Sequence, residues 1–323
     1  MLVDSHAHLE AVEDLEGALV RAKDAGVEKI VTIGTSLASS KKTIEIADSP
    51  SSVRLRSGLR GAKENFPEIY ATVGLHPKDT REELKRLHYN DILKQLRSLV
   101  SASDKVVAIG ECGLDYYERE TGNNKQSLRF SQTAGLKQET SEKNKKYQRE
   151  LFGAQIRLAA ELKLPLVIHC RNGWSEIFEL ITNVKNYSSS ETGGRIEKFS
   201  TRFARKARRA SSNNKLRGVF HSWTGNWDDA KRALDLGFYI SFSGIVTFSN
   251  AADIQEVARK MPFDRILIET DSPYLAPEPF RGSTNEPKNV KIVAQFIAGI
   301  RNQTVDEVSS KTSANARKLF NLL

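Results

Sequence analysis

The sequence is poor in cysteine: among its 323 residues there are only Cys112 and Cys170. The first apolar run already contains Asp4 and His6, and no basic and apolar leader precedes it. We therefore expect reduced thiols in a cytoplasmic protein rather than a disulfide. Runs of about twenty apolar residues are also lacking, which argues against a membrane span. No glycine-rich phosphate-binding motif follows an expected strand, which weakens the case for a nucleotide cofactor.

The net charge of +9 is concentrated in two segments. Residues 119–149 hold eight basic and three acidic side chains, and residues 185–217 hold ten and two. The rest of the chain, with 31 basic and 35 acidic residues, has a net charge of −4. We interpret the two segments as insertions that either attract nucleic acid or are solvated loops. Within the second, "RFARKARRA" (202–210) could also direct the protein to the nucleus.

Short apolar runs rich in β-branched residues alternate with helical patterns. They predict eight strands, at 2–6, 29–34, 70–75, 105–111, 165–169, 217–221, 238–243 and 265–270. Most are apolar throughout, which is typical of parallel strands covered on both faces. Eight such units favour the α/β class and a TIM (β/α)8 barrel, somewhat distorted, over an open doubly wound sheet. We expect residues 1–323 to form a single domain, interrupted by the two insertions. After the first insertion, a helix is expected at 147–164.

Side chains able to bind metal ions gather at the expected carboxyl ends of the strands. In a barrel, all of these ends meet on one face. Imidazole suits Zn, Mn, Fe or Ni, and carboxylate suits Mg or Mn. Any one of these residues alone could be a hydrogen-bonded polar group, but together they suffice for two divalent ions with a glutamate between them. In chain order they are His6, His8, His76, Glu111, His169, His221, Glu269 and Asp271, whereas His88 lies inside a helical pattern.

Further residues near these strand ends suggest the substrate. Arg171, in "VIHCRNG", carries a permanently charged, forked guanidinium group, which beside metal ions is suited to binding a phosphate. Its alternative role is a salt bridge that closes the barrel mouth. His76 could bind phosphate or water, and Lys78 adds positive charge. Trp223 and Trp227, after the sixth strand, could stack on bases or pack against the neighbouring helix.

Six motifs follow one another at a spacing that suits a barrel. They are "VDSHAHL", "ATVGLHP", "AIGECGLDYY", "LPLVIHCR", "FHSWTG" and "ILIETDSPYLAP" with "FRGSTNEPKNV". In this order they resemble the motifs of the TatD family of metal-dependent deoxyribonucleases, within the amidohydrolase superfamily. The match runs from residue 2 to the final "ANARKLFNLL" and omits only the two insertions. The resemblance implies a TIM barrel with one or two divalent ions that hydrolyses DNA, typically from the 3′ end, in DNA degradation or repair.

By position, the resemblance implies two metal sites that share one carboxylate. The first consists of His6, His8, Glu111 and Asp271. The second consists of Glu111, His169 and His221, so that Glu111 bridges the two ions. Asp271 would also accept a proton from the attacking water. The ions expected in function are Mg²⁺ or Mn²⁺, with Zn²⁺ also compatible.

The resemblance also implies roles around these ligands. His76 and Arg171 correspond to substrate-phosphate contacts, and His76 joins Glu111 and Asp271 in the catalytic set. Lys78 stands where family members often have a second histidine, and it can attract phosphate but cannot bind metal while protonated. "HSWTG" replaces the family's frequent "HCFSG" without changing an expected ligand. Glu269 and Asn285 lie in family motifs and are expected to have supporting roles.

The main hypothesis is a divalent-metal-dependent 3′→5′ deoxyribonuclease. We expect it to be a monomer that acts on single-stranded DNA or 3′ ends and has no membrane partner. One alternative is a metal-dependent hydrolase of a small ester, lactone, amide or phosphoester, which the acidic balance of the chain outside its insertions favours. A second alternative is a nucleic-acid-binding protein that acts through the two basic insertions.

Overall fold

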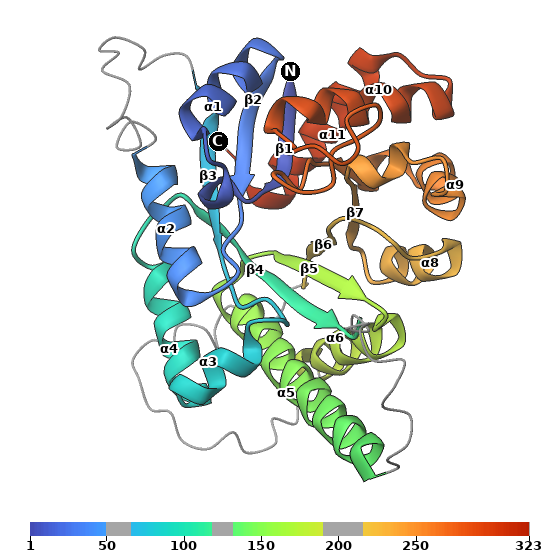
Figure 1. The fold of residues 1–323 in the computed structure, drawn as a ribbon. Helices are drawn as coiled ribbons and strands as arrows, with labels where there is room; N and C mark the ends of the chain where they lie inside the picture. Colours follow the sequence, from blue (N-terminus) through green and yellow to red (C-terminus); the bar gives the residue numbers. More distant parts are fainter. Residues whose placement is uncertain (50–65, 118–131, 190–215, 323) are drawn as a thin grey trace.

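The computed structural model describes residues 1–49, 66–117, 132–189 and 216–322. Within them, parallel strands form one eight-stranded sheet in the order β1 to β8 (Figure 1). This nearly closed barrel is the TIM (β/α)8 fold predicted from the sequence. The strands are β1 (Leu2–Ala7), β2 (Val27–Thr32), β3 (Glu68–Val73), β4 (Val106–Asp115), β5 (Leu166–Arg171), β6 (Gly218–Phe220), β7 (Tyr239–Phe242) and β8 (Ile266–Ile268).

Helices follow the strands and cover the outside of the barrel. No helix among the described residues is long and apolar enough to cross a membrane. The α-helices are α1 (Leu15–Asp24), α2 (Leu37–Asp48), α3 (Thr80–Arg86), α4 (Tyr89–Val100), α5 (Gln132–Leu162), α6 (Trp174–Ser189), α8 (Trp227–Asp235), α9 (Ala252–Lys260), α10 (Val290–Arg301) and α11 (Val305–Phe320). Short 3₁₀ turns are η1 (Leu9–Ala11), η3 (Gly244–Thr247), η4 (Phe263–Arg265) and η5 (Pro287–Asn289).

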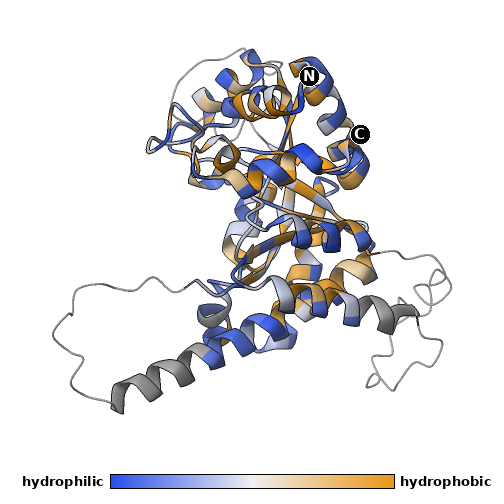
Figure 2. Cartoon of the chain, turned by 90° about the vertical axis from the view of Figure 1, so that its right-hand side faces the viewer, coloured by the Kyte–Doolittle hydropathy of each residue, from blue (hydrophilic) through white to orange (hydrophobic). Residues whose placement is uncertain are grey.

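The apolar residues of the strands divide into two buried clusters, one on each face of the sheet. Along β5, for example, Val167 belongs to one cluster, and its neighbours Leu166 and Ile168 belong to the other. Successive side chains of a strand point to opposite faces, so both faces of this sheet are covered. This arrangement explains the nearly continuous apolar runs in the sequence. Figure 2 shows apolar strands at the centre of the molecule and polar residues along the surrounding helices.

The last helix closes the end of the barrel opposite to the carboxyl ends of the strands. Leu319 and Phe320 of α11 join the smaller apolar cluster, together with Val3 of β1 and Leu267 of β8. The helix begins at a capping box: Thr304 accepts from the Glu307 amide, and the Glu307 side chain accepts from the Thr304 amide. Helix α11 therefore packs against β1 (Figure 1).

The structure corrects the expected extent of the first insertion. Helix α5 begins at residue 132 rather than near 147, so residues 132–149 of the segment expected as a loop over 119–149 are helical. Residues 118–131 lie outside the described part of the chain. In the second expected insertion, residues 185–189 complete α6, whereas 190–215, with "RFARKARRA", lie outside the described residues.

The structure also corrects the expected position of His88 and decides between the two alternatives for Trp223. His88 is not inside a helix but immediately precedes α4, after α3 has ended at Arg86. Trp223 is only 1 % exposed, and its ring packs against Trp174 with 4.4 Å between ring centroids. Trp227 begins α8 and is half-buried against the same core. Packing rather than base stacking is therefore the role of Trp223.

Candidate metal centre

The candidate ligands converge at the carboxyl ends of the strands, as expected for a barrel. His6, Glu111 and His169 are on β1, β4 and β5, and the others directly follow β1, β3, β6 and β8. All are buried except His169, which is half-buried. Glu111 lies inside β4 and not at its end, because β4 continues four residues further than predicted. So many buried polar groups are costly unless they are paired with one another or with a cation.

The first donor group surrounds one point near the seam between β8 and β1. Nε2 of His6 lies 3.5 Å from Oε2 of Glu111 and 3.4 Å from Oδ1 of Asp271. Nε2 of His8 lies 3.7 and 3.3 Å from the same two oxygens and 3.3 Å from Nε2 of His6. Four tetrahedral ligands about 2.1 Å from a divalent ion would be about 3.4 Å apart. The spacing of this group therefore fits a single ion.

The backbone holds these residues together at the seam. The Asp271 amide donates to the His6 carbonyl at 2.9 Å, and the His8 amide donates to the Ser272 carbonyl at 2.7 Å. Although two imidazole nitrogens approach Oδ1 of Asp271, this buried atom has no hydrogen-bond partner among the described residues. A buried carboxylate oxygen in that situation fits a cation between it and the rings.

The second donor group lies on the other side of the Glu111 carboxylate. Its Oε1 atom is 2.9 Å from Nδ1 of His169 and 2.8 Å from Nε2 of His221, and these two nitrogens are 3.1 Å apart. Nε2 of His76 is 3.4 Å from the same oxygen. Glu111 therefore presents Oε2 to one donor group and Oε1 to the other. Three ligands of this kind and an open position could hold a second divalent ion.

Gly113 permits the close pairing of β4 and β5 that brings Glu111 to His169. Gly113 lies opposite His169 in the strand register and has a φ of +144°. A Cβ atom at this position would be 1.9 Å from the His169 carbonyl oxygen. Only glycine avoids this clash and this backbone strain.

The carboxylates of the centre are held in their ionised form. Burial opposes ionisation of Glu111, but the rings of His221 and His76 and hydrogen bonds from His169 hold its pKa well below the usual value. For Asp271, burial is likewise outweighed by His8 and His6, and its pKa is lowered. Both carboxylates are therefore charged at neutral pH, as metal ligands must be.

The imidazoles differ in the direction in which their pKa is shifted. Burial lowers the pKa of His6 and His76, so these rings are neutral near pH 7. Burial also acts on His8, but Asp271 and Glu111 outweigh it and raise its pKa to about 9. The pKa of His221 is raised well above its usual value, where Glu111 and Glu269 outweigh burial. The carboxylates thus favour protonation of these imidazoles, and a divalent cation bound at the same position would compete with the proton.

Comparison with known proteins assigns the chain to a family. The family model described as TatD related DNase matches residues 3–321. The chain belongs to the TatD-related DNase family. Its relatives include the metal-dependent hydrolase YabD of Bacillus subtilis (strain 168), 35% identical with all of both chains covered. Another is the metal-dependent hydrolase YcfH of Escherichia coli (strain K12), 31% identical over 99% of this chain and 96% of that protein.

Solved TatD structures share the fold. The crystal structure of YjjV, a TatD homologue from Escherichia coli K12, aligns with a TM-score of 0.72 and 24% identity over 100% of this chain and 98% of that one. A TatD-family hydrolase from Entamoeba histolytica aligns with a TM-score of 0.70 and 22% identity, covering 99% and 97%. The sequence-based assignment to the TatD family, and with it to the metal-dependent hydrolases, is thus confirmed.

Sequence reasoning missed Asp115, which contacts the outer nitrogen of a candidate ligand of this TatD-family site. Oδ2 of Asp115 lies 3.4 Å from Nε2 of His169, whose Nδ1 atom meets Glu111. The same oxygen is 3.1 Å from Nζ of Lys78. His76, Asp115 and His169 also form a group whose donor atoms lie within 4.8 Å of one another. The sequence could have indicated Asp115, because it is four residues after Glu111 and therefore on the same face of β4, a strand that was predicted to end too early.

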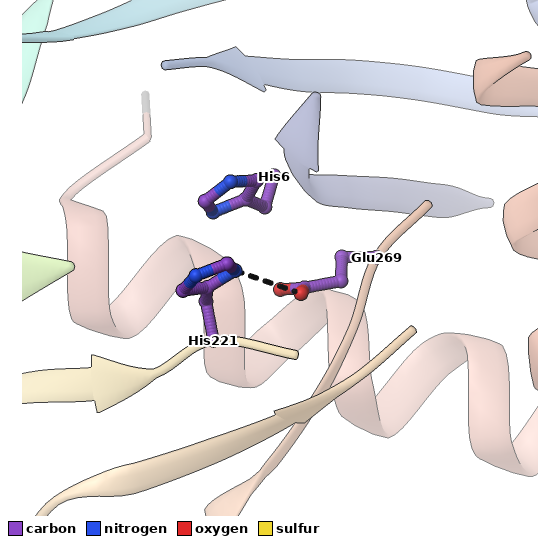
Figure 3. A group of neighbouring side chains, drawn as sticks. All are labelled: His6, His221 and Glu269. Atoms are coloured by element: carbon purple, nitrogen blue, oxygen red, sulfur yellow. Dashed lines mark ion pairs between the residues drawn. The ribbon is translucent and has the colours of Figure 1, made fainter. Parts of the chain in front are cut away.

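Glu269, for which a supporting role is expected, lies beside His221. Its Oε1 atom is 3.4 Å from Nδ1 of His221 and accepts a 2.7 Å hydrogen bond from the Ser222 amide. Figure 3 shows the Glu269 carboxylate at the edge of the His221 ring, with the His6 ring stacked over the face of that imidazole. A carboxylate on the remaining nitrogen of a ligating histidine fixes its tautomer and orientation.

Asn285, the other expected supporting residue of the TatD motifs, shapes the turn after β8. It is fully buried, and its side-chain amide donates to the carbonyls of Thr270 (2.8 Å) and Tyr274 (2.7 Å). These bonds fix both ends of the turn that carries Asp271, whose φ of +59° is unusual for a residue other than glycine.

The two cationic residues differ in their surroundings. Lys78 is paired with Asp115. Arg171 ends β5 and is exposed, and no carboxylate among the described residues lies within 4.0 Å of its guanidinium. Its guanidinium carbon lies 3.5 Å from the centre of the Tyr117 ring. A salt bridge across the barrel mouth, the alternative for Arg171, is therefore not present among the described side chains.

Proposed function

We propose that this protein is a divalent-metal-dependent deoxyribonuclease that hydrolyses DNA phosphodiester bonds stepwise from the 3′ end. The observation that carries the proposal is the position of Glu111, whose two oxygens face two separate groups of histidine and aspartate donors. Pairs of divalent ions that share a ligand are typical of enzymes that cleave phosphate esters. Membership of the TatD-related DNase family supports DNA as the substrate.

In this proposal, His6, His8, Glu111 and Asp271 hold one ion, and Glu111, His169 and His221 hold the second. Mg²⁺ or Mn²⁺ is the expected ion in function, and the imidazole-rich donors also suit Zn²⁺. When bound, such ions supply Lewis acidity toward the phosphate and lower the pKa of a nucleophilic water.

The chain's own residues have separate tasks in the reaction. Asp271 is ionised, so its carboxylate can accept the proton of the attacking water. His76 is neutral and can contact a phosphate oxygen without adding charge. The guanidinium of Arg171, which is not paired with a carboxylate among the described residues, offsets the charge of the phosphate. Lys78 attracts phosphate less strongly, because Asp115 already compensates its charge.

The alternative proposal is hydrolysis of a small ester or phosphoester. It is favoured by the net charge of −4 outside the two basic segments, because an acidic body attracts DNA poorly. Binding of nucleic acid through the two basic segments is the second alternative, and most of the basic residues of these segments lie outside the described part of the chain.

The test compares substrates on one preparation. Protein stripped with a chelator and reloaded with Mg²⁺, Mn²⁺ or Zn²⁺ is incubated with 5′-labelled single-stranded DNA, the same DNA with a blocked 3′ end, matching RNA and a panel of small esters. We expect metal-dependent shortening of DNA from its free 3′ end. Glu111→Gln, purified identically, excludes a contaminating nuclease. Turnover of a small ester without DNA cleavage would replace the deoxyribonuclease proposal by the alternative.

A further inference from the structure

Tyr274 exposes an aromatic ring beside the first donor group. Its side chain is among the few large apolar or aromatic ones that are strongly exposed in the described part of the chain, at 55%. Its ring meets His8 edge-on, with 5.6 Å between the centroids. The backbone is held firmly, because the Tyr274 amide donates to Asp271 and its carbonyl accepts from Asn285. The ring is thus presented to solvent on a fixed support.

Tyr117 exposes a second ring beside the other donor group. It is 44% exposed, and its amide donates to Oδ1 of Asp115 at 3.0 Å, directly after β4. The guanidinium of Arg171 covers one face of this ring. An arginine stacked on a tyrosine offers a flat cationic surface on its outer side.

The two rings lie on opposite sides of the candidate metal centre. Tyr274 follows β8, next to β1, and Tyr117 follows β4, next to β5. In a sheet whose strands run in order from β1 to β8 around a barrel, these two pairs of strands face each other across the mouth. Between them lies the Glu111 carboxylate with its two donor groups.

We propose that Tyr274 and the Tyr117–Arg171 stack are binding surfaces for unpaired nucleobases on the two sides of the scissile phosphate. This inference rests on the proposed deoxyribonuclease function. Every base has an aromatic face, so such surfaces bind single strands without reading their sequence. Paired bases cannot stack on protein rings while they remain inside a duplex. The two surfaces therefore select single-stranded DNA.

Equilibrium binding tests the stacking surfaces separately from hydrolysis. The probe is a fluorescein-labelled thymidine octamer with hydrolysis-resistant phosphorothioate linkages, compared in Mg²⁺ with an abasic octamer of the same backbone. We expect wild-type protein to bind the base-bearing strand at least about tenfold more tightly. Tyr274→Ala and Tyr117→Ala should each reduce this preference several-fold, whereas Tyr274→Phe and Tyr117→Phe keep it. Phe280→Ala, a 49% exposed ring on the Tyr274 loop, is the matched control and should change nothing.

Equal binding of the two octamers by wild-type protein would overturn the proposal. So would an alanine variant that weakens both octamers alike, because that result reports only a displaced Arg171 or phosphate contact. Hydrolysis of ordinary DNA is followed in parallel. A preference for the base-bearing strand without hydrolysis supports the stacking surfaces and contradicts the nuclease proposal. Hydrolysis without that preference supports the nuclease proposal and contradicts the stacking surfaces.

Discussion

The imidazole rings of His6 and His221 stack face to face, with 4.0 Å between their centroids and 8° between their planes. His6 comes from β1 and belongs to the first donor group, and His221 follows β6 and belongs to the second. The stack sets the two Nε2 atoms on the two oxygens of the Glu111 carboxylate, at 3.5 Å and 2.8 Å. A change at any of these three residues is therefore expected to affect both donor groups.

Replacing Glu111 tests the shared ligand most directly. Glu111→Gln keeps the shape of the side chain but removes the charge that both donor groups require. We expect the loss of at least one equivalent of bound metal and a fall in DNA hydrolysis of more than about 100-fold. Metal content by mass spectrometry and end-labelled DNA assays measure the two effects, and circular dichroism checks the fold. Asp253→Asn, an exposed carboxylate on α9, is the control. Full metal content in Glu111→Gln would contradict the bridging role.

Arg171 should affect the substrate without affecting the metal. Arg171→Ala removes a charged hydrogen-bond donor to phosphate, and turnover is expected to fall about 10- to 100-fold while metal content stays unchanged. Arg171→Lys should restore part of the lost turnover. The matched control is Arg232→Ala, since Arg232 also covers an aromatic ring, that of Phe178, but on the outer helices. If Arg171→Ala loses metal, the residue supports the centre itself and does not bind phosphate.

Glu269 is expected to act through His221. Glu269→Gln weakens the acceptor next to Nδ1 of that ring, and we expect the affinity for one metal equivalent to fall about 10- to 100-fold. Calorimetric titration of metal into stripped protein measures each equivalent separately. Glu256→Gln, on the surface of α9, serves as the control. Unchanged affinities for both equivalents would leave Glu269 with a purely structural role.

Metal affinity should rise with pH. In the metal-free protein, His8 has a pKa of about 9, above its ordinary 6.5, so it is protonated at neutral pH. The proton stabilises the metal-free fold fully below pH 6.5, and this contribution disappears as the pH rises through about 9. A metal ion must displace the same proton, so binding at pH 7.5 should release protons and strengthen toward pH 9.

Calorimetry in two buffers of different ionisation enthalpy counts the released protons. At least one proton per bound ion is expected at pH 7.5 and fewer at pH 9.5. His8→Gln, which has no titrating proton, should release fewer protons at pH 7.5. A heat of binding that is independent of the buffer at pH 7.5 would show that the ring is already neutral, contrary to the prediction.

Most of the fold was predictable because parallel strands covered on both faces carry a strong apolar signal. All eight strands occur where the sequence predicted them, within a few residues. The end of β4 was missed because Glu111 and Asp115 interrupt the apolar run, although both remain in the strand. The start of α5 was missed because its first turns are polar and lack the periodic apolar face on which the prediction relied.

Strand order in a barrel brings every carboxyl end to one mouth, so the residues that meet there could be predicted from the sequence alone. They are His6, His8, Glu111, His169, His221 and Asp271. The way in which they meet is visible only in the folded chain: which oxygen of Glu111 faces which ring, that Asp115 and Glu269 contact the outer nitrogens, and that Arg171 lies on Tyr117. These relations depend on side-chain rotamers and on the approach of neighbouring strands, such as β4 to β5 at Gly113, which no single stretch of sequence encodes.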